Sequence, residues 1–135
     1  MGEDDDVPEL KREEAEEFVT RVLELNLPET YPANIAWINQ LIQAFQMKQP
    51  FQNITLLSNY ADRHVPSWED IHRDIFQEGK GGLCLSLNFA FAAVLRSFGV
   101  CAYSAAANYV PTGGRGVHVI TVIDVEKTKR TCWNF

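Results

Sequence analysis

Cys84 is the residue of this sequence best suited to act as a nucleophile. The segment GGLC at 81–84 leads into a long apolar run that ends before Gly99, a pattern typical of a thiol at the first turn of a buried helix. The N-terminal end of a helix has unpaired N–H groups and the positive end of the helix dipole, and both favour an anion. A cysteine there is pushed toward the thiolate, which is the nucleophilic form.

A thiolate nucleophile works with an imidazole within hydrogen-bond reach and a third group that orients the imidazole. His118 lies near the start of the strongest strand pattern in the chain, VHVITVI at 117–123, and is the candidate base. A half-buried structural histidine is the alternative interpretation. Asp124 lies too far along the same strand to reach the ring. Asn134, on the strand predicted next, is therefore the candidate third group, and its carbonyl oxygen would orient the imidazole as in Cys-His-Asn proteases.

Asn88 is the polar exception on the apolar helix that begins at Cys84. It follows Cys84 by one turn and lies on the same face. A buried amide must be hydrogen-bonded. We therefore expect Asn88 to tie this helix to a neighbouring loop.

Apolar periodicity predicts the elements that position these residues. Helical spacing predicts helices over 11–25, 33–48, 67–78 and 84–98, and alternation predicts strands over 100–110, 117–123 and from 131 onward. Residues 54–57 read as a short strand or extended turn, and 124–130 as a charged turn. Helices followed by strands indicate an α+β protein.

Composition limits the classes of function. The 135 residues are 46% hydrophobic and 22% charged, which suits one globular domain. Much of the net charge of −6 comes from the acidic start of the chain, so we expect no nucleic-acid partner. No apolar run is long enough to span a membrane, and none resembles a signal peptide. Three cysteines without a CxxC pair predict free thiols in the cytoplasm and no metal site.

Three segments together resemble the arylamine N-acetyltransferase family. GGLC at 81–84 followed by Asn88 is similar to the family signature RGGxCxxxN, and PFQN at 50–53 is similar to its PFEN segment. His118 before an apolar strand resembles the family's HxxLxV segment. Order and spacing agree, and the resemblance covers roughly residues 14–135. Lys80 in place of the arginine, and glutamine in place of the glutamate of PFEN, depart from the family pattern.

The resemblance implies a helical bundle that passes into an antiparallel β-barrel, as in cysteine proteinases. With the acidic composition of the first residues, we expect a disordered acidic tail (1–10), a helical bundle carrying the nucleophile (11–99) and a partial β-barrel (100–135). The resemblance also implies ping-pong acetyl transfer from acetyl-CoA, a substrate and not a bound cofactor, to a small aromatic amine or hydrazine, as in xenobiotic metabolism. Cys84 would carry the acetyl group and His118 would be its base. Asn134 falls on the family's orienting aspartate if the turn holds one extra residue.

Three other interpretations remain open. The chain could be a catalytically impaired or inactive fragment or paralogue of this fold. It could be a papain-like hydrolase that uses Cys84, His118 and Asn134, or a helical binding module in which the buried cysteine is inert. A comparison of acetyl-CoA with a peptide ester as the acyl donor separates the transferase from the hydrolase.

Overall fold

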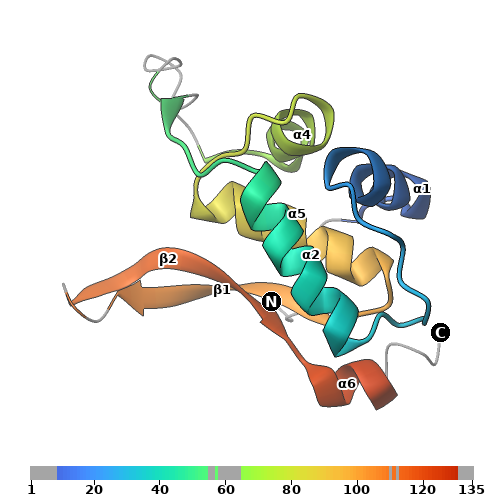
Figure 1. Ribbon diagram of the computed structural model, residues 1–135. Coiled ribbons are helices and arrows are strands. Elements are labelled where there is room, and N and C mark those ends of the chain that lie inside the picture. Colours follow the sequence, from blue (N-terminus) through green and yellow to red (C-terminus); the bar gives the residue numbers. More distant parts are fainter. Residues whose placement is uncertain (1–8, 55–56, 58–64, 110, 112, 131–135) are drawn as a thin grey trace.

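The computed structural model describes residues 9–54, 57, 65–109, 111 and 113–130. Helices form the body of the molecule, and an antiparallel β hairpin lies across one side of it and projects beyond it (Figure 1). From the N-terminus the helices are α1 (Arg12–Glu17), the π-helical η1 (Phe18–Val22), α2 (Ile35–Lys48), α4 (Trp68–Ile71), the π-helical η3 (His72–Gln77), α5 (Cys84–Ser97) and α6 (Val125–Arg130). The strands are β1 (Ala102–Tyr109) and β2 (Gly114–Ile123).

Helix α5 is the centre of the core because its side chains are apolar on nearly every side. Its second half, from Ala90 to Leu95, is buried throughout. The ring of Phe91 packs on Phe45 of α2, with centroids 5.2 Å apart. Phe98, just beyond α5, packs on Trp37 at 5.0 Å. The predicted central helix is confirmed.

The hairpin of β1 and β2 packs along α5. Strand β1 pairs with β2 from Ala102 opposite Ile123 to Tyr109 opposite Gly114, with an irregularity in register at Asn108. Strand β1 lies within the predicted range 100–110. Strand β2 ends as predicted but begins at Gly114, before the predicted start at 117, in a segment expected to be part of a turn. The two described strands form a two-stranded antiparallel sheet, so the mixed helix-and-sheet class is confirmed. The β-barrel and the three-part division of the chain stay predictions.

The prediction of a charged turn over 124–130 is wrong, because α6 occupies Val125–Arg130. The side chain of Asp124 accepts a hydrogen bond from the backbone N–H of Lys127 at 2.8 Å, which caps the helix. The Thr128 hydroxyl donates to the Asp124 carbonyl and accepts from the N–H of Cys101. A local cap and one long-range contact thus convert a charged segment into a helix that packs beside the start of β1.

Two further expectations are also corrected. The backbone N–H of Leu57 donates to the carbonyl of Asn53 at 3.0 Å, a helical bond where an extended segment was expected. Cys101 is disulfide-bonded, whereas Cys84 is free. The inference of a reducing compartment from free thiols therefore does not hold for Cys101. Among the described helices, none combines the length and apolarity needed to cross a bilayer.

The loop before α5 lies against the segment that follows α2. Phe51 and Gly82 form an isolated parallel bridge: the N–H of Gly82 donates to the Pro50 carbonyl at 3.1 Å, and the N–H of Gln52 donates to the Gly82 carbonyl at 3.0 Å. A Cβ at Gly81 would lie 1.9 Å from the Pro50 carbonyl oxygen. Only glycine allows the two backbones to approach this closely.

We expect Gly81→Ala to destabilise the protein much more than Gly79→Ala. Both glycines have positive φ, +70° and +64°, but a Cβ at Gly79 meets nothing within 4 Å. Alanine at Gly79 should cost about 1–2 kcal/mol for the left-handed backbone. Gly81→Ala adds the clash with Pro50 and should cost about 4 kcal/mol or more. Urea unfolding of the two variants measures the difference, and equal losses would show that the close approach is not required.

Candidate active site

Cys84 is the first residue of α5, as predicted. Its N-cap, Leu83, makes no side-chain cap hydrogen bond, and the first turn, which is fully described, contains no acidic residue. The first-turn N–H groups therefore lack a side-chain acceptor from the N-cap. The thiol is free and half-buried. This arrangement leaves the sulfur partly accessible to a reagent.

Asn88 ties the first turn of α5 to strand β2. Its Nδ2 donates to the carbonyls of Cys84 and Val119, at 2.8 Å each. Its Oδ1 accepts from the Thr121 hydroxyl at 2.9 Å. The predicted structural role of Asn88 is confirmed, although its partner is a strand and not a loop. The amide thus fixes the turn that carries Cys84 against the residue next to His118.

His118 lies on β2 opposite Ala107, with an exposed side chain. Alternate residues of a strand share a face, so His118 and Ile120 lie on the same face of β2. Among the described residues, no hydrogen bond joins the His118 ring to the Cys84 thiol. The structure therefore brings their elements together through Asn88. Asn134, the predicted third group, lies outside the described residues.

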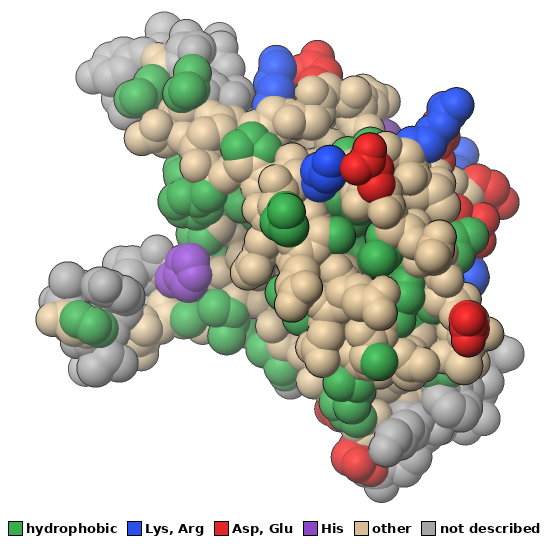
Figure 2. All heavy atoms as spheres, viewed as in Figure 1, with side chains coloured by type: hydrophobic (Ala, Val, Ile, Leu, Met, Phe, Trp, Pro, Cys, Tyr) green, Lys and Arg blue, Asp and Glu red, His purple; other side chains and the backbone are tan. Residues whose placement is uncertain are grey.

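A cleft of about 620 Å³ lies between the two elements that carry Cys84 and His118. It is lined by the end of α2, the segment after α2, one face of α5 and the middle of β2: Ile42, Phe45, Gln46, Gln49, Pro50, Phe51, Leu87, Asn88, Phe91, Ile120 and Thr121. Figure 2 shows the surface hollowed between the hairpin and the body above it, with hydrophobic side chains along the hollow. Leu87 and Asn88 lie one helical turn after Cys84, about 5 Å along the axis. Cys84 therefore lies one helical turn from the cleft and is not itself among the described lining residues.

Two of the departures from the family motifs, at Gln52 and Lys80, are in contact with each other. The side-chain amide of Gln52 donates to the carbonyl of Lys80 at 3.0 Å, a bond that a glutamate carboxylate could not donate. The Lys80 ammonium pairs with Glu78 at 2.6 Å, and this pairing lowers the pKa of Glu78. Gln52 was not among the site residues expected from sequence. Its position in the PFQN segment at 50–53, which resembles a family motif, was the signal in the sequence that could have identified it.

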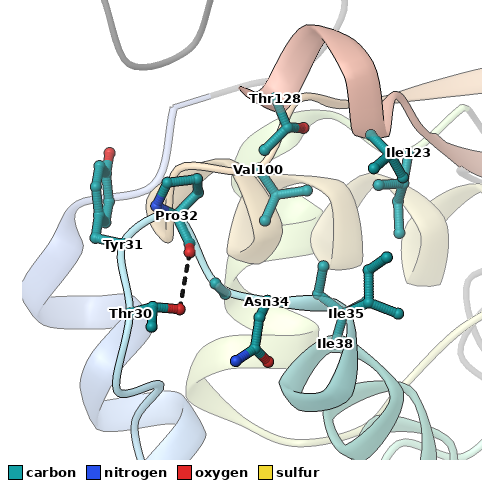
Figure 3. Close-up of a pocket in the computed structure, with 11 residues that line it drawn as sticks. Thr30, Tyr31, Pro32, Asn34, Ile35, Ile38, Val100, Ile123 and Thr128 are labelled. Atoms are coloured by element: carbon teal, nitrogen blue, oxygen red, sulfur yellow. Dashed lines mark hydrogen bonds between the residues drawn. The ribbon is translucent and has the colours of Figure 1, made fainter. Parts of the chain in front are cut away.

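A second cavity, of about 370 Å³, lies near the start of α2. Figure 3 shows Ile35, Ile38, Val100 and Ile123 around a common space. Its polar neighbours are already hydrogen-bonded: the Thr30 hydroxyl donates to the Pro32 carbonyl at 3.1 Å, the Asn34 side chain caps α2, and Thr128 holds Cys101. Its described lining contains no cysteine, histidine or charged residue. We therefore assign chemistry to the cleft beside Cys84.

We expect Asn88→Asp to destabilise the protein by about 2 kcal/mol or more. The substitution keeps the size of the side chain but removes the two donated hydrogen bonds, and it places a carboxylate against two carbonyls. Thr121→Val, which removes one donor to the same amide, should cost about 1 kcal/mol. Chemical unfolding of both variants measures these losses. A smaller loss for Asn88→Asp than for Thr121→Val would contradict the bridging role.

We expect Lys80→Met to raise the pKa of Glu78 toward its ordinary value. The hydrogen bond from Lys80 is the largest cause of the lowered pKa, and Arg73 is a smaller one. A lowered folded-state pKa contributes stability above the ordinary carboxyl range, and this contribution is lost as the pH falls through the folded pKa. NMR titration of the Glu78 carboxyl measures the shift. Arg73→Gln is the control, and a larger effect from it would contradict the assignment.

Two comparisons with known proteins identify relatives of this chain. A family model described as N-acetyltransferase matches residues 34–129. The chain is also similar to the crystal structure of arylamine N-acetyltransferase C from Bacillus anthracis, with a TM-score of 0.68 and 20% sequence identity. This likeness shows a shared fold. It covers 87% of this chain and 46% of the Bacillus chain, so the chain spans about half the length of that relative. No curated protein sequence is matched.

The family match covers most of the chain and includes Cys84, Asn88 and His118. The TM-score agrees with the helical body and hairpin described above. The chain therefore belongs to the arylamine N-acetyltransferase family.

Proposed function

We propose that the chain transfers an acetyl group from acetyl-CoA to the nitrogen of an arylamine or hydrazine. The acetyl group would be carried as a thioester on Cys84. The position of Cys84 supports this proposal most: the thiol is free, begins the central helix and lies beside a largely apolar cleft.

In the first half-reaction, the Cys84 thiolate attacks the carbonyl carbon of the acetyl group. The bond from Sγ to that carbon forms, and the bond from the carbon to the sulfur of CoA breaks. We assign His118, as imidazolium, to give its proton to the departing CoA thiolate. This step leaves acetyl-Cys84 and a neutral imidazole.

In the second half-reaction, the amine nitrogen attacks the thioester carbon. The nitrogen loses a proton to neutral His118, the carbon–sulfur bond breaks, and Cys84 leaves as the thiolate. The starting protonation states are thereby restored. We assign Asn134 to orient His118 through its carbonyl oxygen, a weaker role than that of a carboxylate, since Asn brings no charge to stabilise the imidazolium.

A catalytically impaired member of the family is the second candidate, because the chain spans about half the length of its structural relative. Replacing aspartate by asparagine in the catalytic triad of a serine protease lowers kcat about 10⁴-fold. An impaired member would still be acetylated at Cys84 but would transfer the group slowly. The two half-reactions therefore have to be measured separately.

We expect incubation with acetyl-CoA to increase the intact mass by one acetyl group. Cys84→Ser should abolish the adduct, and His118→Gln should slow its formation about 10²–10⁴-fold. Adding an arylamine should then remove the adduct and yield the acetylated amine. A persistent adduct would indicate the impaired member. Absence of any adduct, or hydrolysis of a peptide ester that depends on Cys84, would overturn the proposal.

A further inference from the structure

Gln49, at the end of α2, is buried without hydrogen bonds to its side chain. Its exposed fraction is 4%, and neither its Oε1 nor its Nε2 has a partner among the described residues. Its backbone N–H is used, since it donates to the Phe45 carbonyl at 2.9 Å. Buried polar groups are normally hydrogen-bonded, and an unpartnered carboxamide is a candidate ligand-binding group.

The cleft that Gln49 lines has no charged residue in its described lining. Asn88 and Thr121 also line it, but they are hydrogen-bonded to each other and to the backbone of α5 and β2. Gln46 is exposed to water. Among the described side chains of the lining, Gln49 therefore has the unpartnered polar group. Its Oε1 and Nε2 are closed to solvent in this structure, so a ligand pairs with them only after the side chain turns toward the cleft. The volume, about 620 Å³, lies within the range of small-molecule sites.

Gln49 also lies close to the loop that leads to the nucleophile. It precedes Pro50, whose carbonyl accepts a hydrogen bond from Gly82 at 3.1 Å, two residues before Cys84. The rings of Phe45 and Phe91 pack on each other in the same lining. The cleft thus combines aromatic walls, a single unused carboxamide and a thiol beside it.

The chemistry of a ligand follows from these features. A glutamine carboxamide presents one acceptor and two donors, with the oxygen and one N–H side by side. A primary carboxamide offers the complementary edge and pairs with it through two hydrogen bonds. The neutral lining favours a neutral molecule, because burying an unpaired charge there would be costly. Aromatic walls favour an aromatic ring.

We propose that Gln49 binds a primary carboxamide on the acetyl acceptor, which is a neutral aromatic amine with its amine at the opposite end. That the ligand is an acetyl acceptor rests on the proposed function. The pantetheine arm of acetyl-CoA also contains amides, but in a trans secondary amide the N–H and the C=O point in opposite directions. Such an amide can form only one of the two bonds at a time, which favours the acceptor as the source of the group.

The test compares para-aminobenzamide with para-aminoacetophenone, in which a methyl group replaces the carboxamide NH₂. Binding is measured by NMR titration without acetyl-CoA, so the result does not depend on catalysis. We expect the protein to bind the carboxamide about tenfold more tightly than the ketone. The carboxamide should also shift the side-chain amide resonances of Gln49. Equal binding, or unshifted Gln49 resonances, would overturn the proposal.

Gln49→Leu should make the two affinities equal, whereas Gln43→Leu, on the exposed face of α2 and outside the described lining, should leave the preference unchanged. Gln49→Leu should not lower Tm, because it removes an unpartnered buried amide. A purely structural glutamine would instead lower Tm when replaced, with no effect on the preference.

Acetyl-CoA then separates this proposal from the proposed function. If the carboxamide is preferred but Cys84 takes up no acetyl group, the proposed function fails and the Gln49 assignment stands. If Cys84 is acetylated but amide and ketone bind alike, the Gln49 assignment fails. If Gln49→Leu slows acetylation by acetyl-CoA while the amide and ketone bind alike, Gln49 contacts the pantetheine amides and the acceptor assignment is overturned.

Discussion

The position of the turn that carries Cys84 depends on one side-chain amide, that of Asn88. The helix of Cys84 and the strand of His118 are far apart in sequence, and Asn88 donates to a carbonyl of each. Its oxygen accepts from Thr121, so both ends of the amide are used. A half-buried amide with its donors and acceptor satisfied is rigid, because any movement would break a hydrogen bond that water replaces poorly. These hydrogen bonds thereby fix the position of the hairpin relative to α5 beside the cleft.

Three amides near the cleft have three different roles. Asn88 joins a helix to a strand, and Gln52 holds the loop carbonyl of Lys80. Both are satisfied within the protein, which makes them structural. Gln49 is more deeply buried and has no partner among the described residues. The same functional group therefore serves as a brace where it is paired and as a recognition group where it is not.

The sequence predicted well those features that depend on local pattern. The apolar run after Cys84 indicated the central helix, and the spacing from Cys84 indicated the structural role of Asn88. Gln49 was missed, although it extends the apolar stripe of Leu41 and Phe45 by one further turn, where a polar residue is conspicuous. Helical spacing identifies the face but cannot show whether a buried amide finds a partner, since that depends on contacts made by other segments.

Local sequence pattern did not predict the helix after β2, the disulfide of Cys101 or the position of His118 relative to Cys84. The helix after β2 begins at a cap made by the Asp124 side chain. Aspartate is common both in turns and at helix N-caps, and the segment was interpreted as a turn. The pairing of Cys101 depends on two distant residues meeting in space. The relation of His118 to Cys84 depends on the register of the hairpin against α5, which a hydrogen bond from Asn88 sets. Contacts between residues far apart in sequence produce no hydrophobic periodicity from which they could be predicted.

The bridge between Phe51 and Gly82 bears on how this site could be moved to another protein. A designer who transplanted only the cysteine loop and its helix would leave Gly82 without the backbone partners that shape the loop. The minimal portable unit is discontinuous: the loop, the first turns of α5 and the stretch after α2 have to be grafted together. A host protein would then need two insertion points at a fixed separation. This requirement is more demanding than a single helix N-terminus.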